Sequence, residues 1–250
     1  MKHFEHAYEL LKELIKIKSP YFYEQEIADY VYEFMLKTGV KVIKQEVSEK
    51  KQFNYECNNI IGYLDAKKDK TILINAHMDT IYITEGWDYD PYDATLIEDK
   101  VYGLGSADMK GGLTSLLLLL EESMKRYKLG EDFKYNIIFL ASVDEEGPYS
   151  LGVKTFLRSE LSRNIDGCFV LESSTGISKN TSGFPTIIYG SKGCYLYNIK
   201  VIGKSSHAAN PDSGINAIKA MCKIVEKIDE ISLEHNEMFN EPARNVIWIN

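Results

Sequence analysis

The sequence has little of several patterns that identify common protein classes. No two of its four cysteines form a CxxC pair, and three of them lie in apolar patterns, so we expect reduced, buried thiols and no disulfide framework. The longest strongly apolar run, Leu116–Leu120, is far too short for a membrane span, which needs about 20 residues. Lys and Arg number 29 against 37 Asp and Glu, a net charge of −8, which argues against a nucleic-acid partner.

The rest of the composition is that of a soluble globular protein. Apolar residues make up 44% of the chain and charged residues 26%, and 250 residues can bury one large domain or two smaller ones. Charged side chains occur throughout the first ten residues, unlike a secretory signal, so we expect a cytoplasmic protein. The sequence contains no internal repeat and no low-complexity tract.

Helical and alternating apolar patterns follow one another through the first two-thirds of the chain. They predict helices over residues 4–18, 24–37, 109–128 and 150–158, strands over 40–47, 59–64, 71–76, 135–143 and 166–171, and a hairpin over 95–102. Strands that alternate with helices predict an α/β fold, here a mixed, mostly parallel sheet covered by helices.

The character of the sequence changes after residue 173. Residues 173–183 are small and polar, which is typical of a linker. The patterns then predict strands over residues 186–189, 195–202 and 245–249, with an amphipathic helix over 214–231. This order is typical of a small α+β module.

Acidic and histidine side chains follow four apolar or glycine-rich runs. These clusters are His77 with Asp79, then Asp108, then Asp144–Glu146, and then Glu172. Ligands of open α/β sheets bind beyond the carboxyl ends of the strands, so we expect the clusters to converge there on a cation. Histidine and carboxylates without cysteine suit zinc, cobalt or manganese in a hydrolase.

Each cluster also has an ordinary structural explanation. His77 could be a buried histidine bonded to the backbone, Asp108 a helix N-cap, and Asp144–Glu146 a solvated acidic turn. In the functional alternative for the acidic turn, one glutamate binds metal and its neighbour acts as general base. Glu172 follows so apolar a run that it is either paired or metal-bound.

Together the segments resemble the dinuclear zinc amidohydrolase family that includes acetylornithine deacetylase, succinyl-diaminopimelate desuccinylase, aminoacylase and glutamate carboxypeptidase. The resemblance runs from the N-terminal helices to the last residue. It rests on Ala76–Thr80, Trp87–Pro91, Tyr102–Gly112, Asp144–Gly147, Leu171-Glu172 and Gly203–Ala217. Several motifs in the family's order are more specific than any one of them.

The resemblance implies a ligand set for two divalent ions, zinc first, with cobalt or manganese as alternatives. His77, Asp108 and Glu172 would surround one metal. Asp108 would bridge to the second metal, which Glu146 would also bind. The family often has a cis peptide after the bridging aspartate, here Asp108–Met109.

The resemblance also implies catalytic roles and a domain division. Asp79 would orient His77, and Glu145 would be the general base for a metal-bridging water. Residues 1–192 would form a zinc-exopeptidase-like catalytic domain, and residues 193–250 part of an inserted lid that also dimerises. His207 in that lid would reach the active site of a partner subunit and stabilise the tetrahedral intermediate.

The sequence departs from the family pattern in three places. Leu104 and Lys192 stand where the family has arginine, and no histidine here matches the family's last metal ligand, which follows the lid. We therefore interpret the chain as the N-terminal portion of a longer enzyme that hydrolyses an amide bond in an N-acyl amino acid or small peptide. The alternative is a non-catalytic or partly folded fragment that binds one metal.

Overall fold

A computed structural model describes residues 2–50, 54–173, 197–228 and 230–234 of the chain. The chain separates into two compact units, Met1–Ser182 and Gly183–Asn250. Within the described residues, no helix is both long and apolar enough to cross a membrane.

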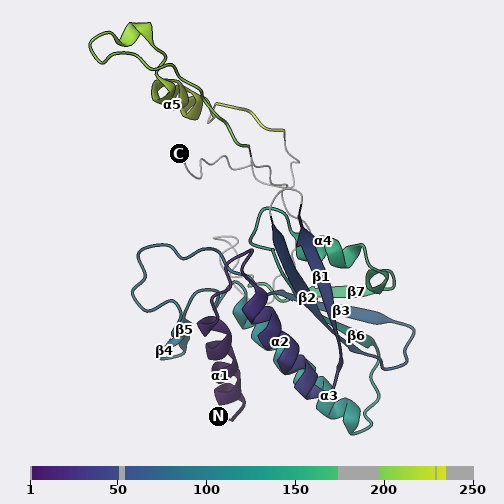
Figure 1. The fold of residues 1–250 in the computed structure, drawn as a ribbon. Coiled ribbons are helices and arrows are strands. Elements are labelled where there is room, and N and C mark those ends of the chain that lie inside the picture. The colour runs from purple at the N-terminus through teal and green to yellow at the C-terminus, as the bar shows by residue number, and fades with distance from the viewer. Residues whose placement is uncertain (1, 51–53, 174–196, 229, 235–250) are drawn as a thin grey trace. The chain divides into compact units, whose positions relative to one another are not determined.

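A five-stranded mixed sheet forms the centre of the first unit (Figure 1). Its strands lie in the order β1 (Lys41–Glu49), β2 (Tyr55–Leu64), β6 (Asn136–Ser142), β3 (Thr71–His77) and β7 (Gly167–Val170). The strand β3 pairs in parallel with β6 and β7, whereas β2 pairs antiparallel with β1 and β6. The predicted mixed sheet is confirmed, and its parallel part is the three-strand group at one edge.

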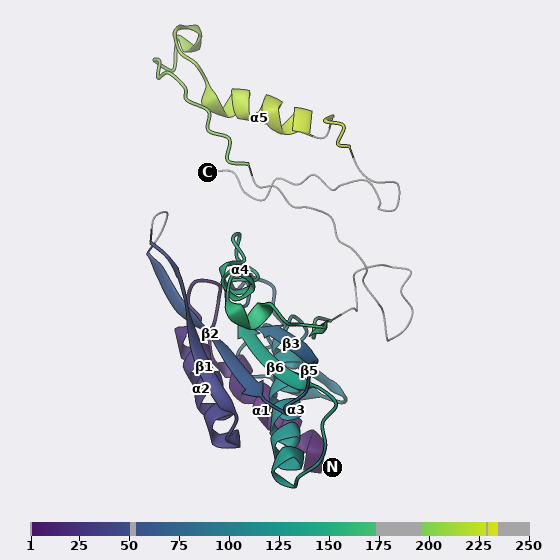
Figure 2. The same cartoon turned by 90° about the vertical axis from the view of Figure 1, so that its right-hand side faces the viewer.

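Helices cover both faces of this sheet (Figure 2). They are α1 (Lys2–Lys16), α2 (Gln25–Thr38) and α3 (Lys110–Lys128) on one face, and α4 (Leu151–Leu157) on the other. Because strand side chains alternate between faces, Phe139 of β6 joins the core under α1 to α3, while Ile138 and Leu140 pack in a second cluster with Phe156 of α4.

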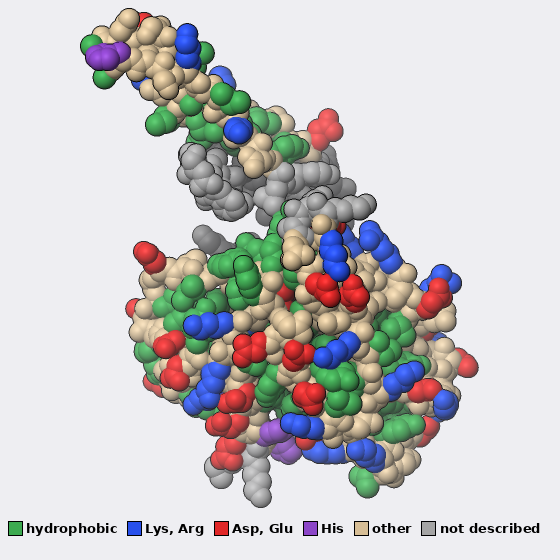
Figure 3. All heavy atoms as spheres, viewed as in Figure 1, with side chains coloured by type: hydrophobic (Ala, Val, Ile, Leu, Met, Phe, Trp, Pro, Cys, Tyr) green, Lys and Arg blue, Asp and Glu red, His purple; other side chains and the backbone are tan. Residues whose placement is uncertain are grey.

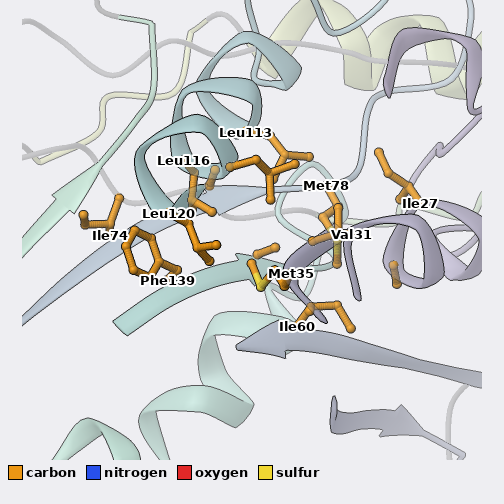
Figure 4. Close-up of a cluster of buried hydrophobic side chains, with 14 of the residues drawn as sticks. Ile27, Val31, Met35, Ile60, Ile74, Met78, Leu113, Leu116, Leu120 and Phe139 are labelled. Atoms are coloured by element: carbon orange, nitrogen blue, oxygen red, sulfur yellow. The ribbon is translucent and has the colours of Figure 1, made fainter. Parts of the chain in front are cut away.

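The main core lies between α2, α3 and the sheet (Figure 4). In α3, leucines at helical spacing are fully buried, namely Leu113, Leu116, Leu117 and Leu120. The helix α2 ends at Gly39, whose φ of 82° is left-handed and whose N–H donates to the carbonyl of Leu36, as its sequence predicts. These contacts fix the helices against the strands that carry the candidate site.

Smaller features of the first unit agree with the sequence in part. The predicted hairpin forms from β4 (Thr95–Ile97) and β5 (Lys100–Tyr102), and a short 3-10 helix, η1 (Glu160–Ser162), precedes β7.

Of the cysteines, Cys57 is buried as expected, whereas the expectation is wrong for Cys168, which lies exposed on the edge strand β7. In Figure 3, acidic and basic side chains are interspersed on the visible face of this unit.

The second unit contains a 3-10 helix, η2 (Pro211–Ser213), and the helix α5 (Ala217–Ile228), which is shorter than the predicted helix. Cys222 on α5 is exposed, also contrary to expectation. Residues 197–202 form no strand, since alternation makes a strand only where a neighbour pairs with it. The expected strands over 186–189 and 245–249 lie outside the described residues.

Candidate metal centre

The carboxyl ends of the parallel strands meet at one edge of the sheet. His77 closes β3 and pairs in register with Ser142, the last residue of β6, so Asp144–Glu146 follow directly beside it. On the other side of β3, Val170 of β7 pairs with Asn75, and Glu172 comes two residues later. The register therefore brings three of the four predicted clusters to one place.

The imidazole of His77 lies at the centre of this group and is only 1% exposed. Its Nε2 lies 3.1 Å from Oδ1 of Asp108 and 3.2 Å from Oε1 of Glu172. Oε2 of Glu145 is 3.7 Å from the same nitrogen. One ring nitrogen thus faces carboxylates from three different segments of the chain.

The other ring nitrogen is held by the backbone. Nδ1 of His77 lies 2.9 Å from the main-chain oxygen of Asp79 and 3.5 Å from its carboxylate Oδ1. A proton on Nδ1 donated to that carbonyl leaves Nε2 free to bind a cation. The fully buried Asp79 carboxylate also accepts a 2.8 Å hydrogen bond from the backbone N–H of Glu146 through Oδ2.

Asp108 does not act as a helix N-cap. The residue before α3 is Met109, without a side-chain cap hydrogen bond, and the Asp108–Met109 peptide is cis, as the resemblance implies. The Asp108 side chain instead turns toward His77. The ordinary explanation for this aspartate therefore does not apply.

Five side chains could supply ligand atoms to divalent ions. Two sets have ligand atoms within 4.8 Å of one another, one made of His77, Glu145 and Glu172, the other of His77, Asp108 and Glu146. All four residues predicted as metal ligands fall in these sets, together with the predicted general base. His207 lies in the second unit, where it is exposed, and its role stays a prediction.

The acid–base properties of the cluster reflect its surplus of negative charge. Burial opposes a proton on His77, but its hydrogen bonds with Asp108, Asp79 and Glu172 outweigh burial and raise its pKa to about 12. Burial, helped by the nearby Asp108, raises the pKa of Glu146 to about 7. Several carboxylates surround a single imidazole, and this oxygen-rich donor set fits a divalent ion, which would offset the surplus negative charge.

Sequence analysis did not identify two buried ionisable residues near this centre. Glu24, just before α2, accepts a 3.1 Å hydrogen bond from the backbone N–H of Asp144. Nζ of Lys110 donates to the carbonyls of Leu14 and Ile17, at 2.8 and 2.7 Å. The available signal for Lys110 was its position on the inner, apolar side of the predicted helix.

Comparison with known proteins identifies a family by sequence, and solved structures of similar fold agree with it. Residues 73–245 match the model for "Peptidase family M20/M25/M40". Succinyl-diaminopimelate desuccinylase of Orientia tsutsugamushi (strain Boryong) is 28% identical over 245 residues, covering 94% of this chain and 58% of that protein. Acetylornithine deacetylase of Buchnera aphidicola (subsp. Acyrthosiphon pisum, strain Tuc7) is 31% identical over 172 residues, covering 68% of this chain and 41% of that protein.

Solved structures share the fold. Human carnosine dipeptidase 1 superposes with a TM-score of 0.57 at 21% identity, covering 67% of this chain and 38% of that one. A tripeptidase from Staphylococcus aureus superposes with a TM-score of 0.56 at 20% identity, covering 90% of this chain and 56% of that one. The chain spans about half the length of the proteins that it matches.

Proposed function

Because the chain belongs to peptidase family M20/M25/M40, we propose that the full-length protein hydrolyses an amide bond in an N-acyl amino acid or a small peptide. The observation that carries this proposal is the convergence of His77 with carboxylates from three segments at the carboxyl edge of the sheet. The names of the relatives, a desuccinylase and a deacetylase, support removal of an acyl group from nitrogen.

The metal-binding part of the proposal uses four residues. His77, Asp108 and Glu172 would hold one divalent ion, and Asp108 with Glu146 would contribute to the site of a second. Zinc is the first choice, with cobalt or manganese as alternatives, because the donors are one imidazole and several carboxylates. When bound, such ions lower the pKa of water and polarise a carbonyl oxygen.

Glu145 is the proposed general base. Its side chain is half exposed at the edge of the cluster, and burial raises its pKa above that of an ordinary glutamate, which makes it a stronger base. Its carboxylate accepts a proton from the attacking water and then delivers it to the leaving amine. Asp79 keeps the strand end and the Glu145 loop together through Glu146.

The remaining parts of the proposal concern residues 193–250. This segment forms part of a lid through which two subunits pair, and His207 stabilises the oxyanion in the partner's site. The protein acts in the cytoplasm on small molecules. These statements rest on the resemblance of the sequence motifs.

The test uses the full-length protein loaded with zinc and a panel of N-succinyl amino acids, N-acetyl amino acids and dipeptides. We expect turnover of at least one class, and a loss of about 100- to 10,000-fold in kcat for Glu145→Gln with the metal content unchanged. Glu160→Gln, at an exposed glutamate of η1, is the matched control. A metal-loaded wild type that cleaves none of these, or an active Glu145→Gln variant, would overturn the proposal.

A second candidate applies to the 250-residue chain by itself. Both candidate ligand sets use the same imidazole, His77, so the described residues supply one histidine for two metals. The chain would then bind one metal without catalysis. Elemental analysis after dialysis separates the two, since one zinc per chain with no amidase activity favours the fragment and two zinc ions favour the enzyme.

A further inference from the structure

We propose that Glu24 is a positioning residue for the active-site loop, which we define as Asp144–Gly147. It acts through the backbone amide of Asp144 and thereby fixes the placement of Glu145. The consequence for catalysis rests on the proposed function. The positioning itself is a property of the fold and can be tested without a substrate.

The side chain of Glu24 is fully buried and does not cap its own helix. It stands at the N-terminus of α2, but no side-chain hydrogen bond caps α2 there. Oε1 accepts instead from the backbone N–H of Asp144 at 3.1 Å, across 120 residues of sequence. Oε2 accepts at 3.1 Å from the hydroxyl of Tyr55, a buried residue of β2.

The backbone at Asp144 needs such support. Its φ of 54° is left-handed, a conformation that a residue with a side chain adopts at a cost in free energy. Its own carboxylate folds back, with Oδ2 accepting from the backbone N–H of Leu151 at 2.9 Å. A Cβ at Gly147 would overlap Oδ1 of Asp144, so the loop closes tightly over this side chain.

The two amides that flank Glu145 are both bound by buried carboxylates from outside the loop. The N–H of Asp144 donates to Glu24 at the start of α2, and the N–H of Glu146 donates to Asp79 beyond β3. Glu145 is thus held by its neighbours while its own side chain stays half exposed. A displacement of about 1 Å in a reacting group can cost on the order of 100-fold in rate, so this support bears directly on turnover.

Core stability does not account for a carboxylate at this position. Burying an ionisable group costs more free energy than burying an amide or an apolar side chain of similar size. Besides the backbone amides of Phe22 and of Glu24 itself, the hydrogen bonds of Glu24 reach the loop and Tyr55, and no Lys or Arg among the described residues forms a salt bridge with it. The geometry therefore assigns it to the loop that carries the general base.

The experiment compares three variants in the full-length, zinc-loaded protein. Glu24→Met keeps the volume of the side chain but has no oxygen acceptor, whereas Glu24→Gln keeps one for the amide of Asp144. Glu26→Ala, at an exposed glutamate two residues further on, is the matched control. We expect kcat to fall about 10- to 100-fold in Glu24→Met, with KM and zinc content nearly unchanged, and to recover in Glu24→Gln.

Amide hydrogen exchange provides the readout that needs no activity. In Glu24→Met, the amide of Asp144 should exchange at least about tenfold faster while the strands β3 and β6 keep their protection. Glu24→Gln and Glu26→Ala should leave it slow. If Glu24→Met fails to fold, Glu24→Ala is measured in its place, at a temperature where its far-UV spectrum is native.

Two results would overturn the positioning role. One is unchanged exchange at Asp144 in the folded Glu24→Met variant. The other is faster amide exchange throughout the sheet together with a loss of bound zinc, which would make Glu24 a general stabilising residue. A wild type that cleaves no amide would refute the proposed function alone, because the exchange measurement still decides the role of Glu24.

Discussion

The backbone N–H of Glu146 donates a 2.8 Å hydrogen bond to Oδ2 of Asp79 and so joins the loop after β6 to the end of β3. The same aspartate holds Nδ1 of His77 through its main-chain oxygen at 2.9 Å. One residue therefore orients two candidate metal ligands, Glu146 through its side chain and His77 chiefly through its main-chain oxygen. Changing the side chain removes the contact with Glu146 and leaves the main-chain acceptor for His77 in place.

Replacing Asp79 with alanine should weaken zinc binding by about 10- to 100-fold, the usual effect of removing a group that orients a ligand. The loss should come from the freed Glu146 loop and from the missing carboxylate beside His77, while the main-chain acceptor for His77 remains. Competition with a chromophoric chelator measures the affinity. Asp29→Ala, at an exposed aspartate of α2, is the control, and equal affinities in both variants would contradict the orienting role.

Gly112 should be intolerant of any side chain. A Cβ at this position would overlap the carbonyl oxygen of Leu171, the residue before Glu172. We expect Gly112→Ala to lower the free energy of unfolding by about 1–3 kcal/mol and to weaken zinc binding. At Gly167 the nearest atom to such a Cβ is 4.0 Å away, so Gly167→Ala should match wild type in urea unfolding and zinc titration. Equal behaviour of the two variants would show that α3 can move.

Lys110 should contribute to stability through two backbone carbonyls. Its buried Nζ, whose pKa burial lowers to about 7, donates to the carbonyls of Leu14 and Ile17 at the end of α1, so Lys110→Met leaves both carbonyls without this donor. We expect a loss of about 1–3 kcal/mol in the free energy of unfolding, measured by urea denaturation. Lys125→Met, at an exposed lysine of the same helix, should change it little. A stable Lys110→Met variant would mean that water replaces this donor.

Glu24 should make the stability of the metal-free protein depend on pH. Burial, with the nearby Asp79, raises its pKa to about 7 from 4.5, so the folded state holds this proton more tightly than the unfolded state. The contribution is complete below pH 4.5 and is lost as the pH rises through about 7. The groups that interact with Glu24 are Asp79, Tyr55, Cys57, Tyr82 and the backbone amide of Asp144.

To test this, the free energy of unfolding in urea is measured for wild type and for Glu24→Gln at pH 5 and at pH 7.5. Wild type should lose about 2 kcal/mol relative to the variant over this range, since one pKa unit corresponds to about 1.4 kcal/mol and part of the shift lies outside the range. Parallel pH profiles for the two proteins would show that Glu24 is ionised throughout. Zinc is left out so that the ligands do not titrate against metal.

Sequence reasoning located the strands and the residues at their ends because both signals are local. Apolar alternation marks a strand such as β3, and the register of a parallel sheet then places His77 beside the loop after β6. The direction of β2, which pairs antiparallel with both of its neighbours, was not predicted. The pattern of β2 is that of a buried strand, and its direction is decided by its pairing with β6, which no local pattern records.

The residues that sequence reasoning missed act across long separations. Glu24 and Asp144 are 120 residues apart, and before the fold is known Glu24 is simply one more acidic residue near a helix start. Lys110 likewise reaches its two carbonyl acceptors only when α1 packs against α3. Composition and periodicity predict helices and strands, but they do not predict which distant residues each side chain contacts in the folded protein.

Because His77 pairs with Ser142, the candidate metal centre forms only when β3 and β6 are in the correct register. A slip of β6 by one residue would carry the acidic loop about 3.3 Å along β3 and turn alternate side chains to the opposite face. A correctly aligned chain and a slipped one would thus differ in zinc capture well before they differ in helix content. During refolding, the appearance of tight zinc binding would time the moment at which the parallel strands reach their final alignment.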